Sequence, residues 1–338
     1  MKKNVLHLLF SSEYGGAEKV VIEMIKSSSS IAKFIYVSKT GGIEDHLKEE
    51  KIDYYLLDKI NLSSIHKLIH DKNINIIHAH DFKASIIASF FSKKCKVISH
   101  IHQSPIWFSK KNYKTILYKS RMNKISNVFV TSNDIKKSFP YQSFNKKFLV
   151  LENVVDTPIL KESSQKKYDF LFVGRLEPEK RPTIFIDYIN LLSNRFKIKN
   201  VAIVGKGSQL ELLEKKVQTR KLNIQFLGFK KNPYDIMQKS KFLIVTSVKE
   251  GFGLAIIESM QLGVPVITMR IGGVTELLDE TNSIIVEDFI TIDDRIITLL
   301  NDEIEYKKMS RDAVIFGEKY RDKTKMINRL KEVYGDDC

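Results

Sequence analysis

The sequence contains few cysteines and no long apolar segment. Only Cys95 and Cys338 occur among its 338 residues, so no disulfide framework is available and a reducing, cytoplasmic setting is expected. No apolar run reaches the roughly 18 residues of a membrane-spanning helix. Glu13, Glu18 and Lys19 interrupt the apolar stretch near the N-terminus, so no secretory pattern is recognised there.

Two ligand-binding motifs are also missing. No Asp-x-Asp occurs, which excludes a diphosphate site that chelates a metal through such a pair, so protein cations must neutralise any bound diphosphate. The first apolar strand is followed by Gly15-Gly16 instead of G-x-G-x-x-G, which does not indicate a dinucleotide. We therefore expect an activity that needs no metal and no cofactor.

Histidines follow two of the expected strands in His-x-His spacing. They are His78, His80, His100 and His102, and Asp81 follows the first pair. Metal ions are often held by histidine and carboxylate ligands, but no fitting carboxylate motif accompanies this spacing. We interpret these histidines as strand-end donors or packing groups and expect no metal site.

Acidic residues are scarce in the first half of the chain. Residues 1–155 contain 25 Lys and Arg against 13 Asp and Glu, which accounts for most of the formal net charge of +15. Between residues 110 and 147, ten basic residues stand against Asp134 alone. Aromatic residues lie at the start of this stretch: Trp107, Phe108, Tyr113 and Tyr118. Three interpretations stay open, namely a solvated basic face, a surface for an anionic membrane or lipid phosphate, and a nucleic-acid interface without a recognised motif.

Strand-like apolar runs alternate with helical periodicity along the chain. Strands are expected at 4–10, 34–37, 54–57, 74–78, 97–101, 127–131, 148–150, 169–173, 201–204, 224–227, 242–245 and 264–268. Helices are expected at 18–26, 43–50, 62–72, 184–192, 210–217, 233–238, 254–261, 295–300, 304–316 and 325–334. A polar linker at 158–168 separates the two halves. The alternation predicts an α/β fold of two domains, 1–157 and 166–318, with parallel sheets covered on both faces and a cleft between the domains.

The stretch from Phe242 to Glu276 contains the strongest ligand-binding pattern. An apolar strand leads into a polar loop, then Gly251 and Gly253, then a helix and a second buried strand. Glycines let backbone amides approach a ligand, and a helix N-terminus favours an anionic phosphate. Glu250 and Glu258 flank this point, and a carboxylate beside a phosphate is costly unless it binds hydroxyl groups. The pattern favours a phosphate that carries sugar hydroxyls, although an ordinary crossover with two surface glutamates is the alternative.

Two cations follow the first strand of the second half. Arg175 and Lys180 lie in the loop at its carboxyl end, where open parallel sheets bind ligands. Together they can hold a diphosphate and neutralise it as it leaves, whereas the alternative is a pair of exposed charges that flank a helix. We interpret Glu177 and Glu179, which lie between them, as charges that complement a helix dipole.

In these features the chain resembles the retaining GT-B glycosyltransferases of family four, the glycosyl transferases of group one. Five segments carry the resemblance: GGAEKVV at 15–21, VISHIHQ at 97–103, VGRLEPEK at 173–180, VGKGSQLELLE at 204–214, and 250–277 with EGFGLAIIESMQLGVPVI and GGVTEL. The last contains the family's two glutamates at the family's spacing. The resemblance implies a GT-B architecture of two Rossmann-like domains, with the donor held mainly by the second. It also implies a terminal helix, about 319–338, that returns to the first domain.

The resemblance assigns roles to individual residues. The implied catalytic residues are Arg175, Lys180, Glu250 and His102. The implied donor-binding residues are Gly16, Gly174, Gly205, Gly228, Phe229, Phe252, Gly253, Leu254 and Glu258. Arg175 and Lys180 would grip the diphosphate, together with the amides that follow Gly251 and with Gly16. Glu258 would bind the ribose, Glu250 and His102 the transferred sugar, and the loop at 228–230 the base.

The implied activity is sugar transfer with retention from a nucleotide-diphosphate donor, a UDP-sugar on family frequency. The expected acceptor is a glycan or lipid-linked glycan in cell-surface polysaccharide synthesis, at the inner face of the plasma membrane, and the sugar is a hexose or N-acetylhexosamine. A nucleotide-sugar 2-epimerase of the same architecture and a non-enzymatic, basic nucleic-acid-binding protein are the alternatives. The joint presence of Arg175, Lys180, Glu250 and Glu258 argues against the nucleic-acid partner.

Overall fold

The computed structural model describes residues 2–103, 105–160 and 166–335, which form two compact units. The first unit comprises Met1–Val154 and Asp322–Cys338, and the second comprises Val155–Arg321. The predicted bounds of 157 and 319 each differ from these by three residues. Thr157 lies in the second unit because its N–H and its hydroxyl both donate to Gln261 Oε1, at 3.1 and 3.0 Å. Residues 161–165 of the predicted linker, Cys338 and the end of the terminal helix lie outside the described residues.

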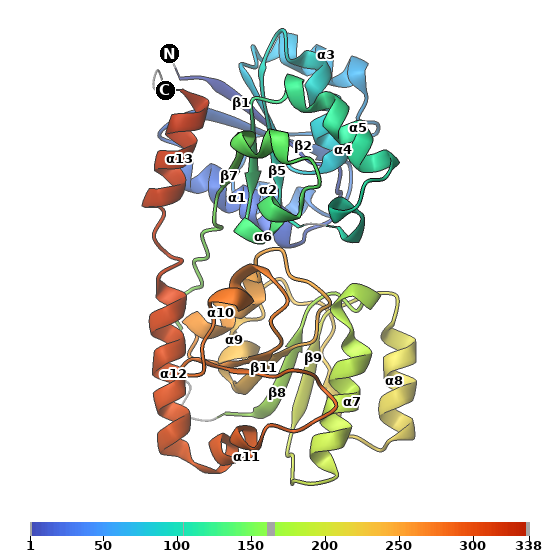
Figure 1. Ribbon diagram of the computed structural model, residues 1–338, viewed down its shortest axis with the longest axis vertical. Coiled ribbons are helices and arrows are strands. Elements are labelled where there is room, and N and C mark those ends of the chain that lie inside the picture. Colours follow the sequence, from blue (N-terminus) through green and yellow to red (C-terminus); the bar gives the residue numbers. More distant parts are fainter. Residues whose placement is uncertain (1, 104, 161–165, 336–338) are drawn as a thin grey trace. The chain divides into compact units, whose positions relative to one another are not determined.

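The first unit is a parallel sheet with helices on both faces (Figure 1). Its elements are β1 (Asn4–Leu8), α1 (Gly16–Ser28), β2 (Lys33–Lys39), α2 (Glu44–Glu49), β3 (Tyr54–Leu57), α3 (Leu62–Asp71), β4 (Ile76–Ala79), α4 (Phe82–Ala88), β5 (Lys96–Ile101), α5 (Tyr113–Arg121), β6 (Asn127–Val130), α6 (Asn133–Ser138), β7 (Phe148–Val150) and α13 (Thr324–Tyr334). The strand order is β3-β2-β1-β4-β5-β6-β7. The strands were predicted within a few residues, whereas α4, α5 and α6 were not predicted.

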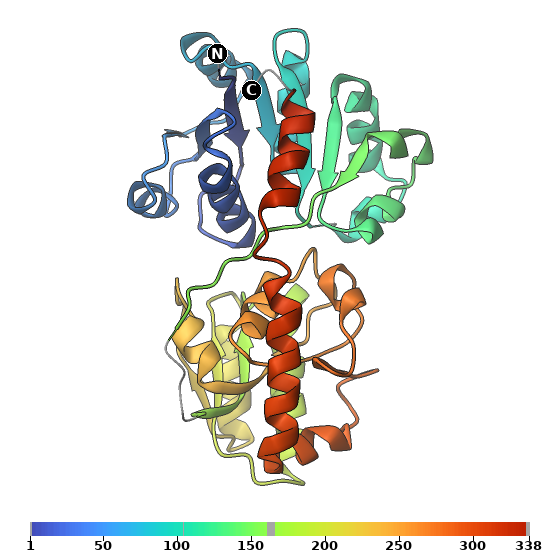
Figure 2. The same cartoon turned by 90° about the vertical axis from the view of Figure 1, so that its left-hand side faces the viewer.

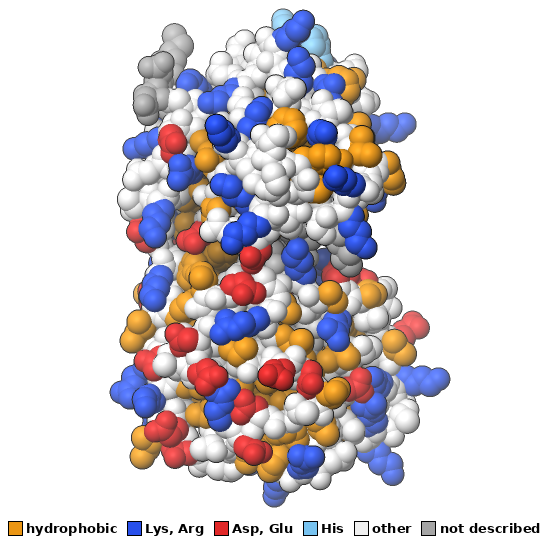
Figure 3. Space-filling view, viewed as in Figure 1, with side chains coloured by type: hydrophobic (Ala, Val, Ile, Leu, Met, Phe, Trp, Pro, Cys, Tyr) orange, Lys and Arg blue, Asp and Glu red, His pale blue; other side chains and the backbone are white. Residues whose placement is uncertain are grey.

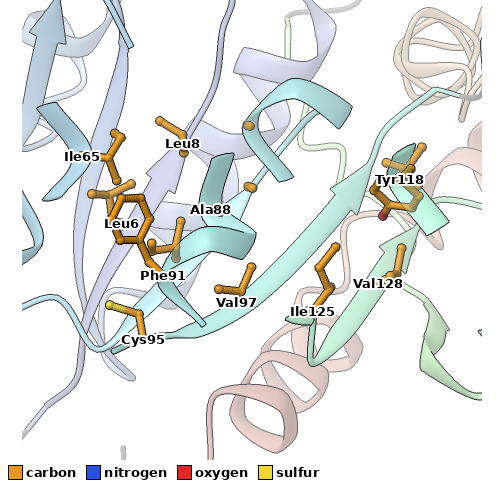
Figure 4. Packing of buried hydrophobic residues seen from close by; sticks show 14 of the residues in the cluster. Leu6, Leu8, Ile65, Ala88, Phe91, Cys95, Val97, Tyr118, Ile125 and Val128 are labelled. Atoms are coloured by element: carbon orange, nitrogen blue, oxygen red, sulfur yellow. The ribbon is translucent and has the colours of Figure 1, made fainter. Parts of the chain in front are cut away.

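Successive residues of β1 enter opposite cores of the first unit, as the two-residue period of a strand requires. Leu6 and Leu8 pack with Val97 of β5 and with Ile65 of α3 and Phe91, which follows α4 (Figure 4). Val5 and Leu9 enter the opposite core, which α1 and α13 cover. The strand therefore reads as a continuous apolar run, which is typical of a parallel strand that is buried on both faces.

Helix α13 packs against the second of these cores (Figure 2). Its apolar side is formed by Met326, Leu330, Val333 and Tyr334, all buried. The Tyr334 hydroxyl lies 2.8 Å from His78 Nδ1, and the Lys3 ammonium donates to the Tyr334 carbonyl at 2.8 Å. These contacts make the last described helix part of the first unit, although it follows the whole second unit in the chain.

The second unit repeats the same architecture with a smaller sheet. Its elements are β8 (Tyr168–Val173), α7 (Pro182–Ser193), β9 (Val201–Val204), α8 (Leu210–Thr219), β10 (Ile224–Phe226), α9 (Tyr234–Gln238), β11 (Ser240–Val245), α10 (Leu254–Gln261), β12 (Val266–Thr268), β13 (Ser283–Ile285), α11 (Asp294–Asn301) and α12 (Glu303–Glu318). The parallel strands are ordered β10-β9-β8-β11-β12-β13. Helices α7 and α8 pack on one face, and α9 and α10 pack on the other. The α/β prediction is confirmed, and the cleft between the domains stays a prediction.

The sequence predicted no membrane-spanning helix. Among the described residues, no helix combines the length and the apolar character needed to cross a bilayer.

Candidate functional site

The predicted donor-binding residues of the second unit gather at the carboxyl edge of its sheet. Strand β8 lies between β9 and β11, so the chain turns towards β9 after β8 and towards β12, on the opposite side, after β11. Such a reversal leaves an opening between neighbouring loops at the strand ends, which is where open α/β sheets bind ligands. Three loops meet here: the β8–α7 loop with Lys180, the β9–α8 loop with Gly205, and the β11–α10 loop with Glu250.

Lys180 and Glu250, which are 70 positions apart in the chain, form an ion pair at this edge. Lys180 Nζ lies 2.7 Å from Glu250 Oε1, and the Ser247 hydroxyl donates to the same oxygen at 2.6 Å. The two charged side chains are only 22% and 12% exposed. The Thr246 hydroxyl fixes the backbone beneath them by donating to the carbonyls of Lys180 and Arg181, at 2.9 and 3.0 Å. One cation and one carboxylate are thus held side by side.

Arg175 does not join this ion pair. Its Nη2 lies 2.7 Å from Glu179 Oε1, and its side chain is 61% exposed. Glu177 accepts hydrogen bonds from the N–H and the hydroxyl of Ser208, at 2.9 and 2.6 Å, which lowers the pKa of its carboxyl. Glu177 therefore binds the neighbouring β9–α8 loop and Glu179 binds Arg175 within its own loop, contacts that the interpretation as helix-dipole charges missed.

Three of the predicted glycines bring the loops after β8, β9 and β10 into contact. The Gly174 N–H donates to the carbonyl that ends β9, at 3.0 Å, and the Gly205 N–H donates to the Gly228 carbonyl at 2.9 Å. A side chain at Gly205 would place its Cβ 1.9 Å from the Gly174 carbonyl oxygen, so only glycine fits. Phe229 is 46% exposed, and the Lys206 ammonium lies 5.4 Å from its ring centroid. The predicted base-binding loop thus presents an aromatic face.

Helix α10 begins beside the ion pair. Gly253, which precedes its first residue Leu254, has φ +99°, and a Cβ there would lie 2.7 Å from Val274 Cγ1. The Phe252 carbonyl accepts from the Val274 N–H at 2.8 Å, which holds the loop in place. The N–H groups of a first helical turn have no intrahelical acceptors and attract anions. Glu258 lies one turn further along α10 and is 6% exposed.

The other two predicted site residues, Gly16 and His102, belong to the first unit. Gly16 is the first residue of α1, and His102 directly follows β5. His102 Nε2 lies 2.9 Å from His80 Nδ1, and His80 Nε2 lies 2.7 Å from His7 Nδ1. Sequence reasoning missed His7, although the register pairs it with His78 on the same face of the sheet. The available signal was the two-residue period, which places His7, His78 and His100 on one face.

These histidines form a cluster in which His7, His78, His80 and His100 are buried and His102 is half-buried. Burial lowers the pKa of His7 to about 3 and that of His102 to about 4, and it holds the pKa values of His78, His80 and His100 well below the usual range. Two trios in the cluster place ring nitrogens within 4.8 Å of one another, His7–His78–His80 and His80–His100–His102. Two nitrogens on one tetrahedral zinc lie about 3.3 Å apart. The two short separations of 2.7 and 2.9 Å are instead hydrogen-bond distances.

Comparison with known proteins assigns the second unit to a family. Residues 158–314 match the family described as glycosyl transferases group 1. The chain carries a group 1 glycosyl transferase domain. It is 27% identical over 300 residues to an uncharacterized glycosyltransferase of Methanocaldococcus jannaschii, covering 86% of this chain and 82% of the relative. It is 26% identical over 305 residues to the O-antigen biosynthesis glycosyltransferase WbnH of Escherichia coli, covering 85% and 86%.

The similarity to solved structures extends over both units. Anabaena HepE, whose structures include complexes with UDP and with UDP-glucose, superposes with a TM-score of 0.83 at 19% identity. In the UDP complex, the match covers 99% of this chain and 99% of the other. At this identity the likeness shows the fold alone. The predicted GT-B architecture and the predicted similarity to group 1 glycosyltransferases are thereby confirmed.

Proposed function

We propose that this glycosyltransferase moves a sugar, with retention, from a UDP-sugar to a hydroxyl of a glycan or lipid-linked glycan during synthesis of a cell-surface polysaccharide. The observation that carries the proposal is the Lys180–Glu250 pair beside the first turn of α10, because this edge combines a cation, a carboxylate and the N-terminus of a helix. Phosphates suit the cation and the amides, and sugar hydroxyls suit the carboxylate. WbnH, named for O-antigen biosynthesis, and HepE, solved with UDP, support the choice of substrates.

The proposed mechanism follows from charge. As the bond from the sugar to the diphosphate breaks, negative charge grows on the leaving phosphate, and Lys180, Arg175 and the α10 amides stabilise it. This step follows binding of the donor, which separates the Lys180–Glu250 ion pair. The phosphate of the donor contacts Lys180, and Glu250 turns to the hydroxyls of the sugar. The acceptor hydroxyl attacks from the same face, and the leaving phosphate takes its proton. Because protein cations supply the positive charge, we expect transfer without a metal.

A panel of nucleotide sugars tests the proposal. Each is incubated with the protein and candidate acceptors, and the released nucleotide diphosphate and the glycosylated product are measured. We expect release from one UDP-sugar, and its identity separates a hexosyltransferase from an N-acetylhexosaminyltransferase. Conversion of the sugar nucleotide without any glycosylated acceptor would favour the 2-epimerase instead.

Glu258→Gln should weaken binding of UDP itself, because we assign Glu258 to the ribose hydroxyls. Loss of a charged hydrogen-bond acceptor corresponds to about 1.5–3 kcal/mol, or roughly 10- to 100-fold in affinity. Isothermal titration calorimetry with UDP measures the change. Glu250→Gln is the matched control, because we assign Glu250 to the transferred sugar. It should lower turnover while UDP binds as in the wild type. Unchanged UDP affinity in the Glu258 variant would remove Glu258 from the nucleotide site.

The structure changes which residues of the basic stretch can meet a membrane. Phe108 and Tyr118 are fully buried, and Trp107 is half-buried against the core, so of the four aromatic residues noted in this stretch Tyr113 is the one that is mostly exposed. The exposed apolar residues here are Phe90 at 54%, Tyr113 at 74%, Ile116 at 55% and Leu117 at 47%. Exposed basic residues surround them: Lys110, Lys111, Lys114 and Lys119. We call these eight residues the α5 surface. Figure 3 shows apolar and basic side chains interspersed over α4 and α5.

We propose that the α5 surface holds the enzyme on the anionic inner face of the plasma membrane, beside a lipid-linked acceptor. Apolar side chains can enter the headgroup layer, and each lysine near it contributes about 1 kcal/mol, which salt screens. Replacing Lys110, Lys111 and Lys114 by Glu should abolish flotation with anionic liposomes, which the wild type should show at low salt and lose at high salt. Replacing Lys215, Lys221 and Lys308, all exposed, matches the charge change and should leave flotation intact. Equal amounts of the protein in the floated fraction with neutral and with anionic liposomes would contradict attachment to an anionic membrane.

A further inference from the structure

The two carboxylate oxygens of Glu250 differ in their contacts. Oε1 lies 2.7 Å from Lys180 Nζ and accepts a hydrogen bond from the Ser247 hydroxyl at 2.6 Å. Oε2 accepts no hydrogen bond from the residues that the structure describes. The Glu250 side chain is only 12% exposed, and polar atoms in such places normally have hydrogen-bond partners. Oε2 is therefore the oxygen that can accept a hydrogen bond from a bound ligand.

The hydrogen bond from Ser247 is the shorter of the two contacts to Oε1. A separation of 2.6 Å is typical of a hydroxyl that donates to an ionised carboxylate, a bond about twice as strong as one between neutral groups. Ser247 is 3% exposed and lies two residues beyond the end of β11, so the sheet fixes its position. Ser247 therefore holds Glu250 by a contact that does not involve Lys180.

Lys180 is held by a separate set of contacts. The Thr246 hydroxyl donates to the carbonyls of Lys180 and Arg181, at 2.9 and 3.0 Å. The Val248 N–H donates to the Glu179 carbonyl at 2.9 Å. These hydrogen bonds fix the main chain of the β8–α7 loop and do not involve the Lys180 ammonium. The two partners of the ion pair are thus anchored independently, so the pair can separate while both loops stay in place.

We propose that Ser247 is a positioning residue that retains Oε1 of Glu250 after a donor phosphate has taken Lys180, so that Oε2 accepts hydrogen bonds from hydroxyl groups of the transferred sugar. The inference rests on the proposed function, because it requires a phosphate at Lys180 and a sugar at Glu250. Without the Ser247 hydroxyl, the carboxylate would have no donor once the phosphate binds. It could then adopt several rotamers and would contact the sugar for only part of the time.

Turnover of Ser247→Ala tests the inference with the nucleotide sugar that the panel selects. We expect turnover to fall about ten- to a hundredfold, the range for losing one hydrogen bond to a charged group, while UDP binds as in the wild type. Ser247→Cys keeps a side chain of similar size and a weak donor, so its turnover should be intermediate. Ser240→Ala is the matched control, because Ser240 is fully buried at the start of the same strand and donates to the Ile236 carbonyl at 2.8 Å. It should keep wild-type turnover.

A double-mutant cycle distinguishes positioning of Glu250 from general damage to the loop. In the Glu250→Ala background no carboxylate is left to hold, so adding Ser247→Ala should change the residual turnover by less than about twofold. An equal loss in both backgrounds would overturn the inference, because Ser247 would then act on another group. Wild-type turnover in Ser247→Ala, or a loss of UDP affinity as large as the loss of turnover, would also overturn it. If the wild-type protein releases UDP from no nucleotide sugar, the proposed function itself fails, and this inference fails with it.

Discussion

Replacing Lys180 by alanine is expected to lower turnover by roughly 10²-fold or more, the scale for losing one group that stabilises transition-state charge. The ammonium lies 2.7 Å from Glu250 and is 22% exposed, so no nearby solvent cation replaces it. Its loss also leaves the Glu250 carboxylate without a counter-charge, and that carboxylate would repel an incoming diphosphate. Steady-state release of UDP from the selected donor measures the effect.

Two controls separate catalysis from folding in this experiment. Lys215→Ala removes an exposed lysine of α8 in the same unit and should leave turnover unchanged. The thermal transition of Lys180→Ala should stay close to that of the wild type, because Lys180 ends the short turn Pro178–Lys180 and the Ser247 hydroxyl still donates to Glu250 in the variant. Wild-type turnover in Lys180→Ala would remove Lys180 from the site.

Acidification from pH 7 towards pH 4 should destabilise the first unit by several kcal/mol. Burial lowers the pKa of His102 to about 4 and that of His7 to about 3, against about 6.5 in an unfolded chain. Below pH 6.5 the unfolded state therefore binds protons that the folded state does not, and the free energy of unfolding falls as the pH falls. A pKa shift such as that of His102 lowers the free energy of unfolding by about 3 kcal/mol at pH 4.

Protonation of two other buried groups changes the free energy of unfolding in the opposite direction. Burial raises the pKa of Glu18 and of Asp81, so their protonation in the folded state favours folding as the pH falls. The five histidines outnumber these two carboxyl groups. We therefore expect the free energy of unfolding to fall as the pH falls. Tryptophan fluorescence during urea unfolding isolates the effect, because Trp107 is the only tryptophan and lies in the first unit. A free energy of unfolding that stays constant between pH 7 and pH 4 would contradict the prediction.

His100→Leu gives a matched test of the same prediction. His100 is fully buried, and neither of its ring nitrogens has a hydrogen-bond partner among the described residues. An apolar side chain of similar size removes a proton-binding group without breaking a hydrogen bond, which is neutral or stabilising. The variant should therefore lose less stability on acidification than the wild type. An equal loss would mean that His100 has little part in the acid response.

Local sequence patterns predicted the strands except β13, and they missed three short helices of the first unit. Strands such as 201–204 are continuous apolar runs, which a parallel sheet buried on both faces requires. Helices α4, α5 and α6 have 6 to 9 residues, and length alone does not explain why they were missed, because α2 and α9, with 6 and 5 residues, were predicted. Their start signals were nevertheless present, because Asp81, Asn112 and Ser132 each accept a hydrogen bond from the first turn.

The sequence by itself predicted where the candidate site of this protein lies along the chain. Lys180 and Glu250 stand in loops that follow apolar strands, and loops after parallel strands meet at one edge of the sheet. That these two residues form an ion pair was decided by β8 lying next to β11. The hydrogen-bonded histidines His7, His80 and His102 likewise lie together because β1, β4 and β5 are neighbours, and Phe108 and Tyr118 are buried because their core closes over them. Hydrophobic periodicity predicts the secondary structure of each segment. Contacts between distant residues depend on which strands pair when the whole core forms.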